Sequence, residues 1–530
     1  MNIYHLCDRT VQDEYNQAGW DYTPAYFSAV FAYMGIPSTE ISSDSLHRIG
    51  EDDILFVGAN HPNRLPSCHL FILGSEVAKR VDKCYGFVIY KDQKLPIFAP
   101  FTKPTLQGDV CYFAQDERGN KIPAIVKKGK TIEFCFDLLG SIWFSGDGYF
   151  RGPSPEFPIP LGRTPDTRPI GNGYEIPYND LLLSIIEDEM GLLKVPAIYK
   201  LPPMADGSVP DFALHLSGDD DCHSAQYNLN ATLACEQYGF PYHINAMAVG
   251  GTEFAFTKED FDEVLAHGGE FGLHGDYTNG AYTFDSVKGQ VEKFIARFGV
   301  HPLTNTNHCF IQHGTTAQRL RWISKCGMIA DNGKLGYYDP KDINAFDLHD
   351  YGFGTAFPRF SLDDAKHKNQ PLLTMEIPIN YYEPRLYEED SSTKKIEDYI
   401  TCCAKNGRFA QLFIHPHYLN DEIPHEKQAV CRVLEVVGGV INQNKYRVLY
   451  TTTNGIARFW KARQQATLKV AGNEIHCHCA VASLVALPFT VEKVKLNNQE
   501  AKIHCRDGKT LVFVPPGNHT ISFDEKIQHQ

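Results

Sequence analysis

Acidic and histidine side chains follow several short apolar runs of the sequence. Three consecutive aspartates come after the run at 212–216, and single histidines come after three later runs: Asp219, Asp220 and Asp221, then His274, His308 and His415. Three adjacent carboxylates at the end of a buried strand are costly to ionise unless a cation or hydrogen-bond donors lie nearby. Together with imidazole nitrogens, they are typical ligands of a divalent metal. The residue types therefore predict a metal site.

The elements that would position these residues alternate regularly between about residues 211 and 460. The apolar runs lie at 212–216, 242–249, 271–273, 302–306, 328–330, 372–379, 410–414 and 447–450. The segments 257–267, 285–298, 315–326 and 392–406 are predicted helices, each followed by glycine. Seven or eight such units over about 250 residues are typical of a distorted (β/α) barrel. Because the strands of such a barrel end at one shared mouth, we expect the polar side chains to meet there.

Each of these residues, taken singly, has a plainer explanation. An aspartate-rich strand end is often only a helix N-cap or a turn, and a lone histidine is more often structural than a ligand. What favours a site is that Asp219 and Asp220, His274 and His415 occupy equivalent strand ends of one repeating pattern.

The region from 211 to about 460 resembles the polysaccharide deacetylases, the NodB-like carbohydrate esterases. Their Thr-Phe-Asp-Asp motif is similar to 217–220, which implies Asp219 as general base and Asp220 as metal ligand. Their metal-histidine motif is similar to 272–278 and implies His274 as a ligand. Their late Leu-x-His motif is similar to 412–415 and implies His415 as general acid.

Two positions depart from the family's pattern. The second metal histidine would fall at Thr278, a poor zinc ligand, so we expect the third ligand to be His308, with His223 and Asp276 as alternatives. No arginine stands near 304–308 to orient the general base. Asn305 or Asn307 is expected to substitute by hydrogen bonding.

The resemblance implies a metal-dependent N-deacetylase, with zinc as the expected metal and an N-acetylated sugar or related amide as substrate. A second hypothesis is a metal-free glycoside hydrolase, in which Asp219 or Asp220 pairs with Glu376; an ion pair within the barrel is the other explanation of Glu376. A third is a non-catalytic carbohydrate-binding protein on a degenerate barrel. Metal content and the effect of a chelator distinguish the three.

The rest of the chain predicts further units on either side of a barrel at 211–463. Residues 1–150 are expected to form an α/β layer domain, and 129–143 resemble glutamine-amidotransferase-like domains. Cys68 and Cys84 lack the flanking glycines of an exposed nucleophile turn, so this domain is expected to bind or scaffold. Residues 151–210 are predicted to be a Pro-rich linker with one helix, and 464–530 a small β domain, in which His476 to Cys479 form a plain strand.

Composition excludes several classes of protein. The chain has 530 residues and a net charge of −14, so nucleic acid is not an expected partner. No apolar window approaches the length of a membrane span, and the N-terminus lacks the pattern of a signal peptide. The fifteen cysteines show no C-x-x-C pair, which favours a reducing cytoplasm over a disulfide framework. The sequence leaves the oligomeric state open.

Overall fold

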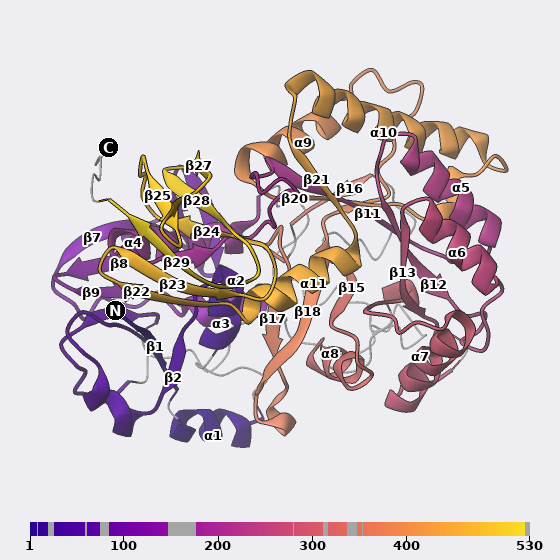
Figure 1. Ribbon diagram of the computed structural model, residues 1–530. Coiled ribbons are helices and arrows are strands. Elements are labelled where there is room, and N and C mark those ends of the chain that lie inside the picture. The colour runs from indigo at the N-terminus through magenta and orange to yellow at the C-terminus, as the bar shows by residue number, and fades with distance from the viewer. Residues whose placement is uncertain are drawn as a thin grey trace.

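The computed structural model describes residues 1–7, 9–19, 26–58, 61–74, 84–146, 176–278, 280–310, 316–335, 347–351 and 353–524 (Figure 1). Within these ranges, no helix combines the length and the apolar character needed to cross a bilayer. All fifteen cysteines belong to the described residues, and none forms a disulfide. Residues 151–175 of the predicted linker lie outside the described residues.

The N-terminal part forms a nine-stranded mixed sheet. Its parallel half contains β2 (Thr39–Ile41), β1 (Ile3–Leu6), β3 (Ile54–Val57), β4 (His69–Ile72) and β9 (Thr131–Phe134). Its antiparallel half contains β8 (Lys121–Lys128), β7 (Asp109–Asp116), β5 (Gly86–Tyr90) and β6 (Gln93–Ile97). Helix α2 (Phe27–Met34) packs Phe27 and Phe31 against Phe56 of β3. Strands β5 to β9 follow one another with no helix between them in the described residues, so strand and helix do not alternate throughout this part.

Residues 212–451 contain a curled sheet that is mainly parallel (Figure 1). Its parallel neighbours run in the order β20 (Phe409–Phe413), β11 (Phe212–Asp219), β12 (Tyr242–Met247), β13 (Gly269–Gly275), β14 (Thr304–Asn307), β15 (Ala330–Leu335) and β18 (Pro371–Ile379). Strand β21 (Val448–Thr451) also pairs with β11, and β17 (Arg359–Leu362) pairs antiparallel with β18. Directly after β18, Tyr382 of β19 (Tyr381–Tyr382) pairs with Phe413 of β20. The sheet therefore curls back toward its first strand.

Six α-helices of the described residues lie between the strands of the curled sheet, and a seventh, α11, follows its last strand. They are α5 (Ala225–Glu236), α6 (Lys258–Ala266), α7 (Phe284–Phe298), α8 (Thr316–Lys325), α9 (Lys394–Asn406), α10 (Pro424–Asn444) and α11 (Thr453–Gln464). Gly299 and Gly407 end α7 and α9 with φ of 74° and 60°, a region of backbone space that favours glycine. The mixed α/β class is confirmed. The complete arrangement with boundaries at 150, 210 and 463 stays a prediction.

The C-terminal residues are all β in the described part. A five-stranded sheet contains β22 (Thr467–Ala471), β23 (Glu474–Cys479), β29 (Gly517–Phe523), β25 (Val494–Leu496) and β26 (Gln499–Glu500). A four-stranded sheet contains β10 (Ala197–Ile198), β24 (Ser483–Leu487), β28 (Lys509–Val514) and β27 (Ile503–Arg506). In β23 the two histidines are exposed and the two cysteines are buried, as a plain strand requires.

The N-terminal part and the curled sheet share one hydrophobic core. The ring of Tyr33 on α2 packs against Phe357 and Trp460, and helix α4 (Tyr178–Leu192) contributes buried residues to the same core. Arg463 at the end of α11 donates hydrogen bonds to the carbonyls of Ala32 and Tyr33 at 2.9 and 3.0 Å. A lysine or arginine that reaches the last carbonyls of a helix caps it, so α11 holds the end of α2 in place.

Candidate metal centre

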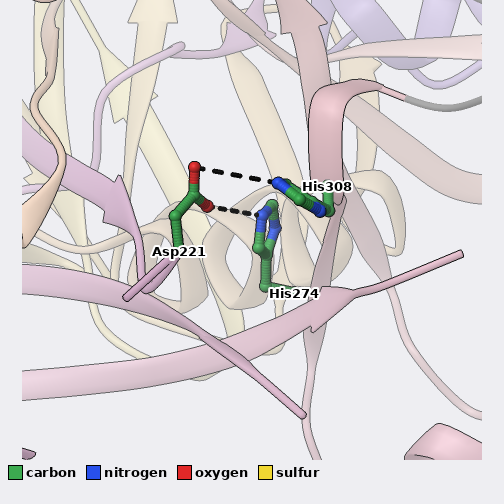
Figure 2. A group of neighbouring side chains, drawn as sticks. All are labelled: Asp221, His274 and His308. Atoms are coloured by element: carbon green, nitrogen blue, oxygen red, sulfur yellow. Dashed lines mark ion pairs between the residues drawn. The ribbon is translucent and has the colours of Figure 1, made fainter. Parts of the chain in front are cut away.

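Five side chains from the ends of four parallel strands meet at one place. Asp219 ends β11, Asp221 follows it, and the histidines belong to or follow β13, β14 and β20: His274, His308 and His415. The ligand atoms of Asp221, His274 and His308 lie within 4.8 Å of one another, and so do those of Asp219, Asp221 and His415. Figure 2 shows the first group, with both imidazoles turned toward the carboxylate.

Asp221 is the centre of this cluster. Its Oδ1 lies 3.2 Å from His274 Nε2, and its Oδ2 lies 3.8 Å from His308 Nε2 and 3.4 Å from His415 Nε2. Asp219 Oδ2 lies 3.4 Å from His274 Nε2. The neighbouring histidines depress the pKa of the Asp221 carboxyl well below its usual range, although burial opposes that shift.

The hydrogen bond made by Nδ1 of His274 determines whether Nε2 of the neutral ring carries a proton. Nδ1 lies 2.9 Å from the carbonyl oxygen of Thr306, which only accepts, so Nδ1 carries the proton. In the neutral ring Nε2 then presents a lone pair toward Asp219 and Asp221. Among the described residues, neither His274 Nε2 nor Asp221 Oδ1 has a hydrogen-bond partner, and both atoms are buried. Two buried acceptors that face each other fit a divalent cation between them.

Asp276 positions His308. Its Oδ1 lies 3.4 Å from His308 Nδ1 and accepts hydrogen bonds from the backbone and hydroxyl of Thr278 at 3.0 and 2.7 Å. Burial lowers the pKa of His308, but Asp276, Cys309 and Asp221 together outweigh burial and raise the pKa to about 10. Thr278 thus supports the carboxylate behind His308, and Asp276 acts from behind the ring while His308 Nε2 faces the cluster.

Glu383 holds His415 from behind. Its Oε1 accepts hydrogen bonds from the backbone N–H of His415, at 2.9 Å, and from Nδ1 of the ring. Arg385 pairs with Glu383 at 2.8 Å and with Glu426 at 2.9 Å. Burial opposes the charged imidazole, yet Tyr382, Asp221 and Glu383 raise the pKa of His415 well above its usual value. The ring's Nε2 is therefore the atom that carries an exchangeable proton into the site.

Asp219 is oriented by a residue that the sequence did not indicate. Asn245 of β12 donates from Nδ2 to Asp219 Oδ1 at 2.8 Å. Asn305 instead donates to Asn307 and Asp331, at 3.0 and 2.8 Å. The asparagine that hydrogen-bonds Asp219 is therefore Asn245 of the second strand, not Asn305 or Asn307 as expected. Burial raises the pKa of Asp219, and His274 and His415 oppose the increase.

Asp220 lies outside the cluster. Its Oδ1 accepts from the backbone N–H of Ser224 at 3.2 Å, at the start of α5, and burial raises its pKa to about 8. His223 has φ of 53° and belongs to neither group of ligand atoms. Asp219 and Asp221 are separated by two positions, so they point to the same side of an extended chain while Asp220 points to the other. This alternation was a signal in the sequence that could have favoured Asp221.

Glu376, the carboxylate of the glycoside hydrolase hypothesis, is part of a buried ion pair. Arg319 Nη2 lies 2.7 Å from Glu376 and 3.2 Å from Asp331, and all three side chains are buried. The ion-pair explanation of Glu376 is confirmed. In the N-terminal part, burial raises the pKa of the Cys68 thiol to about 11 and also raises that of Cys84, which disfavours either as a nucleophile.

Among known proteins, the chain is similar only at low identity to the solved structures named below. No family model matches the chain, and no curated protein matches it. Among solved structures, the peptidoglycan deacetylase PdaC from Bacillus subtilis is 13% identical, with a TM-score of 0.26 over 49% of this chain and 96% of that one. A family 4 acetyl xylan esterase from Clostridium thermocellum, in complex with cobalt, is 11% identical, with a TM-score of 0.24 over 46% and 89%. A family 4 carbohydrate esterase from Bacillus anthracis is 10% identical, with a TM-score of 0.25 over 50% and 96%. TM-scores this low do not establish a shared fold.

Proposed function

We propose that the protein is a metal-dependent hydrolase that removes the acetyl group from the nitrogen of an N-acetylated sugar or a related amide. The observation that supports this proposal is the convergence of Asp219, Asp221, His274, His308 and His415 from four strand ends. Carboxylates and imidazoles in this arrangement are suited to hydrolysis assisted by a metal and by acid–base pairs.

Asp221, His274 and His308 would hold the cation, for which we propose zinc. One carboxylate oxygen and two imidazole nitrogens are a donor set typical of catalytic zinc, which has three protein ligands and one open position. When bound, a divalent ion polarises an acyl carbonyl and lowers the pKa of water. Asp221 replaces Asp220 as the proposed carboxylate ligand, because only the Asp221 oxygens face the two imidazoles.

Asp219 and His415 would move the protons. Asp219, held by Asn245, takes a proton from the attacking water, whose oxygen bonds to the acyl carbon. His415, held by Glu383, donates the Nε2 proton to the nitrogen as the carbon–nitrogen bond breaks. The products are acetate and the free amine. Arg385 neutralises part of the Glu383 charge and keeps that carboxylate aimed at the ring.

The test is release of acetate from soluble N-acetylglucosamine oligomers by the full chain, supplied with zinc, cobalt or nickel. Asp219→Asn should lower kcat by about 10²- to 10⁴-fold while metal content stays unchanged. Glu259→Gln, an exposed change on α6, is the control. Full activity in Asp219→Asn, or activity undiminished by a chelator, would contradict the proposal. A metal-loaded protein that binds the oligomers without cleaving them would favour the carbohydrate-binding alternative.

We propose a cytoplasmic protein, as the sequence predicts, and soluble oligomers are therefore the chosen substrate. A metal-free glycoside hydrolase is disfavoured because Glu376 is tied to Arg319. Release of reducing sugar in the presence of a chelator would instead support a glycoside hydrolase.

A further inference from the structure

A second cleft lies far from the metal cluster, where three parts of the molecule meet. It has a volume of about 420 Å³, within the range of small-molecule sites. Its walls come from α4, from the turn between α9 and β20, and from the sheet that contains β27 and β28. In Figure 1, α4, β27 and β28 lie together on the left, apart from α5 to α7 on the right.

The walls of this cleft carry an excess of positive charge, in a chain whose net charge is −14. Six cationic and four acidic side chains line it: Lys91, Lys200, Lys405, Arg408, Arg506 and Lys509, with Asp180, Glu187, Asp188 and Asp507. Lys200 and Lys509 lie 3.0 and 3.5 Å from Glu187, and Lys91 lies 3.2 Å from Asp188. Glu187 and Asp188 of α4 are thus already paired with three of the lysines.

Arg408 differs from these lysines. It is 8% exposed, and its Nη1 donates to the sulfur of Cys402 at 3.4 Å. No carboxylate among the described residues forms an ion pair with it. Asp180, which also lines the cleft, favours the charged form of Arg408 from beyond ion-pair distance. A guanidinium has five N–H donors, and burying its charge without a directly paired anion is costly. The exposed Lys405 lies on the same turn and lines the same cleft.

We propose that this cleft binds a small molecule that carries an oxyanion, a phosphate or a carboxylate, and that the oxyanion pairs with Arg408. Guanidinium is suited to both groups because its planar fork matches two oxygens at once. Arg408 directly precedes β20, and His415 follows the other end of that strand. At about 3.3 Å per residue, the two positions are roughly 20 Å apart along the chain, so this site is separate from the metal cluster.

The test is isothermal titration calorimetry of the full chain with three probes: inorganic phosphate, glucose 6-phosphate and glucuronate. At least one should bind, and Arg408→Met should weaken that binding about tenfold or more. Binding of the two phosphates but not of glucuronate would assign a phosphate ligand, and the reverse would assign a carboxylate.

Further variants keep the test decisive. Lys405→Glu changes an exposed residue and should also weaken binding, so it decides the matter where Arg408→Met does not fold. Lys495→Glu, an exposed change outside the cleft, and Asp221→Asn in the metal cluster should bind the probe as the wild type does. The proposal is overturned if no probe binds, if Lys405→Glu and a folded Arg408→Met bind as tightly as the wild type, or if Asp221→Asn abolishes binding.

Discussion

The curled sheet contains two pairs of buried or partly buried carboxylates whose surroundings differ. Asp331 of β15 and Glu376 of β18 are paired in register, and Arg319 lies 3.2 and 2.7 Å from them. Asp219 and Asp221 at the end of β11 have histidines around them. Among the described residues, no lysine or arginine forms an ion pair with either of these two aspartates.

This difference distinguishes a structural acid pair from a candidate site. A guanidinium is always protonated, so Arg319 gives its two carboxylates a shared counter-charge that cannot lose its proton. Imidazole can lose its proton and bind a metal, so the counter-charge at Asp219 and Asp221 is exchangeable. Acidic residues in a barrel therefore indicate a metal or catalytic site only when the neighbouring cationic side chain can lose its proton.

Replacing Arg319, the permanently charged partner of Asp331 and Glu376, should have the largest effect, which is on stability. Arg319→Met leaves two buried carboxylates uncompensated and should lower the free energy of unfolding by about 3 to 5 kcal/mol, measured by urea denaturation. Adding Asp331→Asn and Glu376→Gln to that variant should restore much of the loss, and added zinc should restore none. A loss below about 1 kcal/mol in Arg319→Met would show that the ion pairing contributes little.

A smaller effect, on zinc affinity, is expected from replacing Asp276, the carboxylate that contacts His308 Nδ1. Asp276→Asn keeps an oxygen for Thr278 but removes the charge that orients the imidazole. Zinc affinity of the metal-stripped protein should fall about 10- to 100-fold, measured by competition with a chromogenic chelator. Glu259→Gln is the matched control. Unchanged affinity in Asp276→Asn would remove His308 from the proposed ligand set.

The smallest effect on zinc affinity should come from replacing Asp220. Its side chain accepts from the backbone of Ser224 and lies outside the cluster, so Asp220→Asn should change zinc affinity by less than about twofold. A loss as large as that of Asp276→Asn would reinstate Asp220 as a ligand, as the deacetylase motif implies.

Much of the candidate site could be predicted from the sequence because polar residues after parallel strands share one mouth. Asp219, His274, His308 and His415 were predicted in this way, and they do meet. Asp221 was missed because the family motif placed the ligand one residue earlier, where strand alternation turns the side chain away. Asn245 and Glu383 were missed because one lies inside an apolar run and the other follows β19 in a chain segment without periodicity.

The fold was predictable where local signals were strong. Gly299 and Gly407 ended two helices at the expected positions, and β1, β3, β5 and β9 of the N-terminal part lie at short apolar runs of the sequence. The antiparallel strands β7 and β8 were missed because β7 does not alternate polar and apolar residues and β8 contains Pro123, a residue that argues against a central strand. The pairing of β10 with β24, nearly 300 residues later, depends on tertiary packing that no local pattern encodes.

Zinc titration of the metal-stripped protein by calorimetry tests the central claim most directly. The wild type should bind one zinc ion per chain, and Asp221→Asn should lose that binding because its oxygens face both imidazoles. A wild-type protein that takes up no zinc, or an Asp221→Asn variant that binds it as tightly as the wild type, would contradict the account.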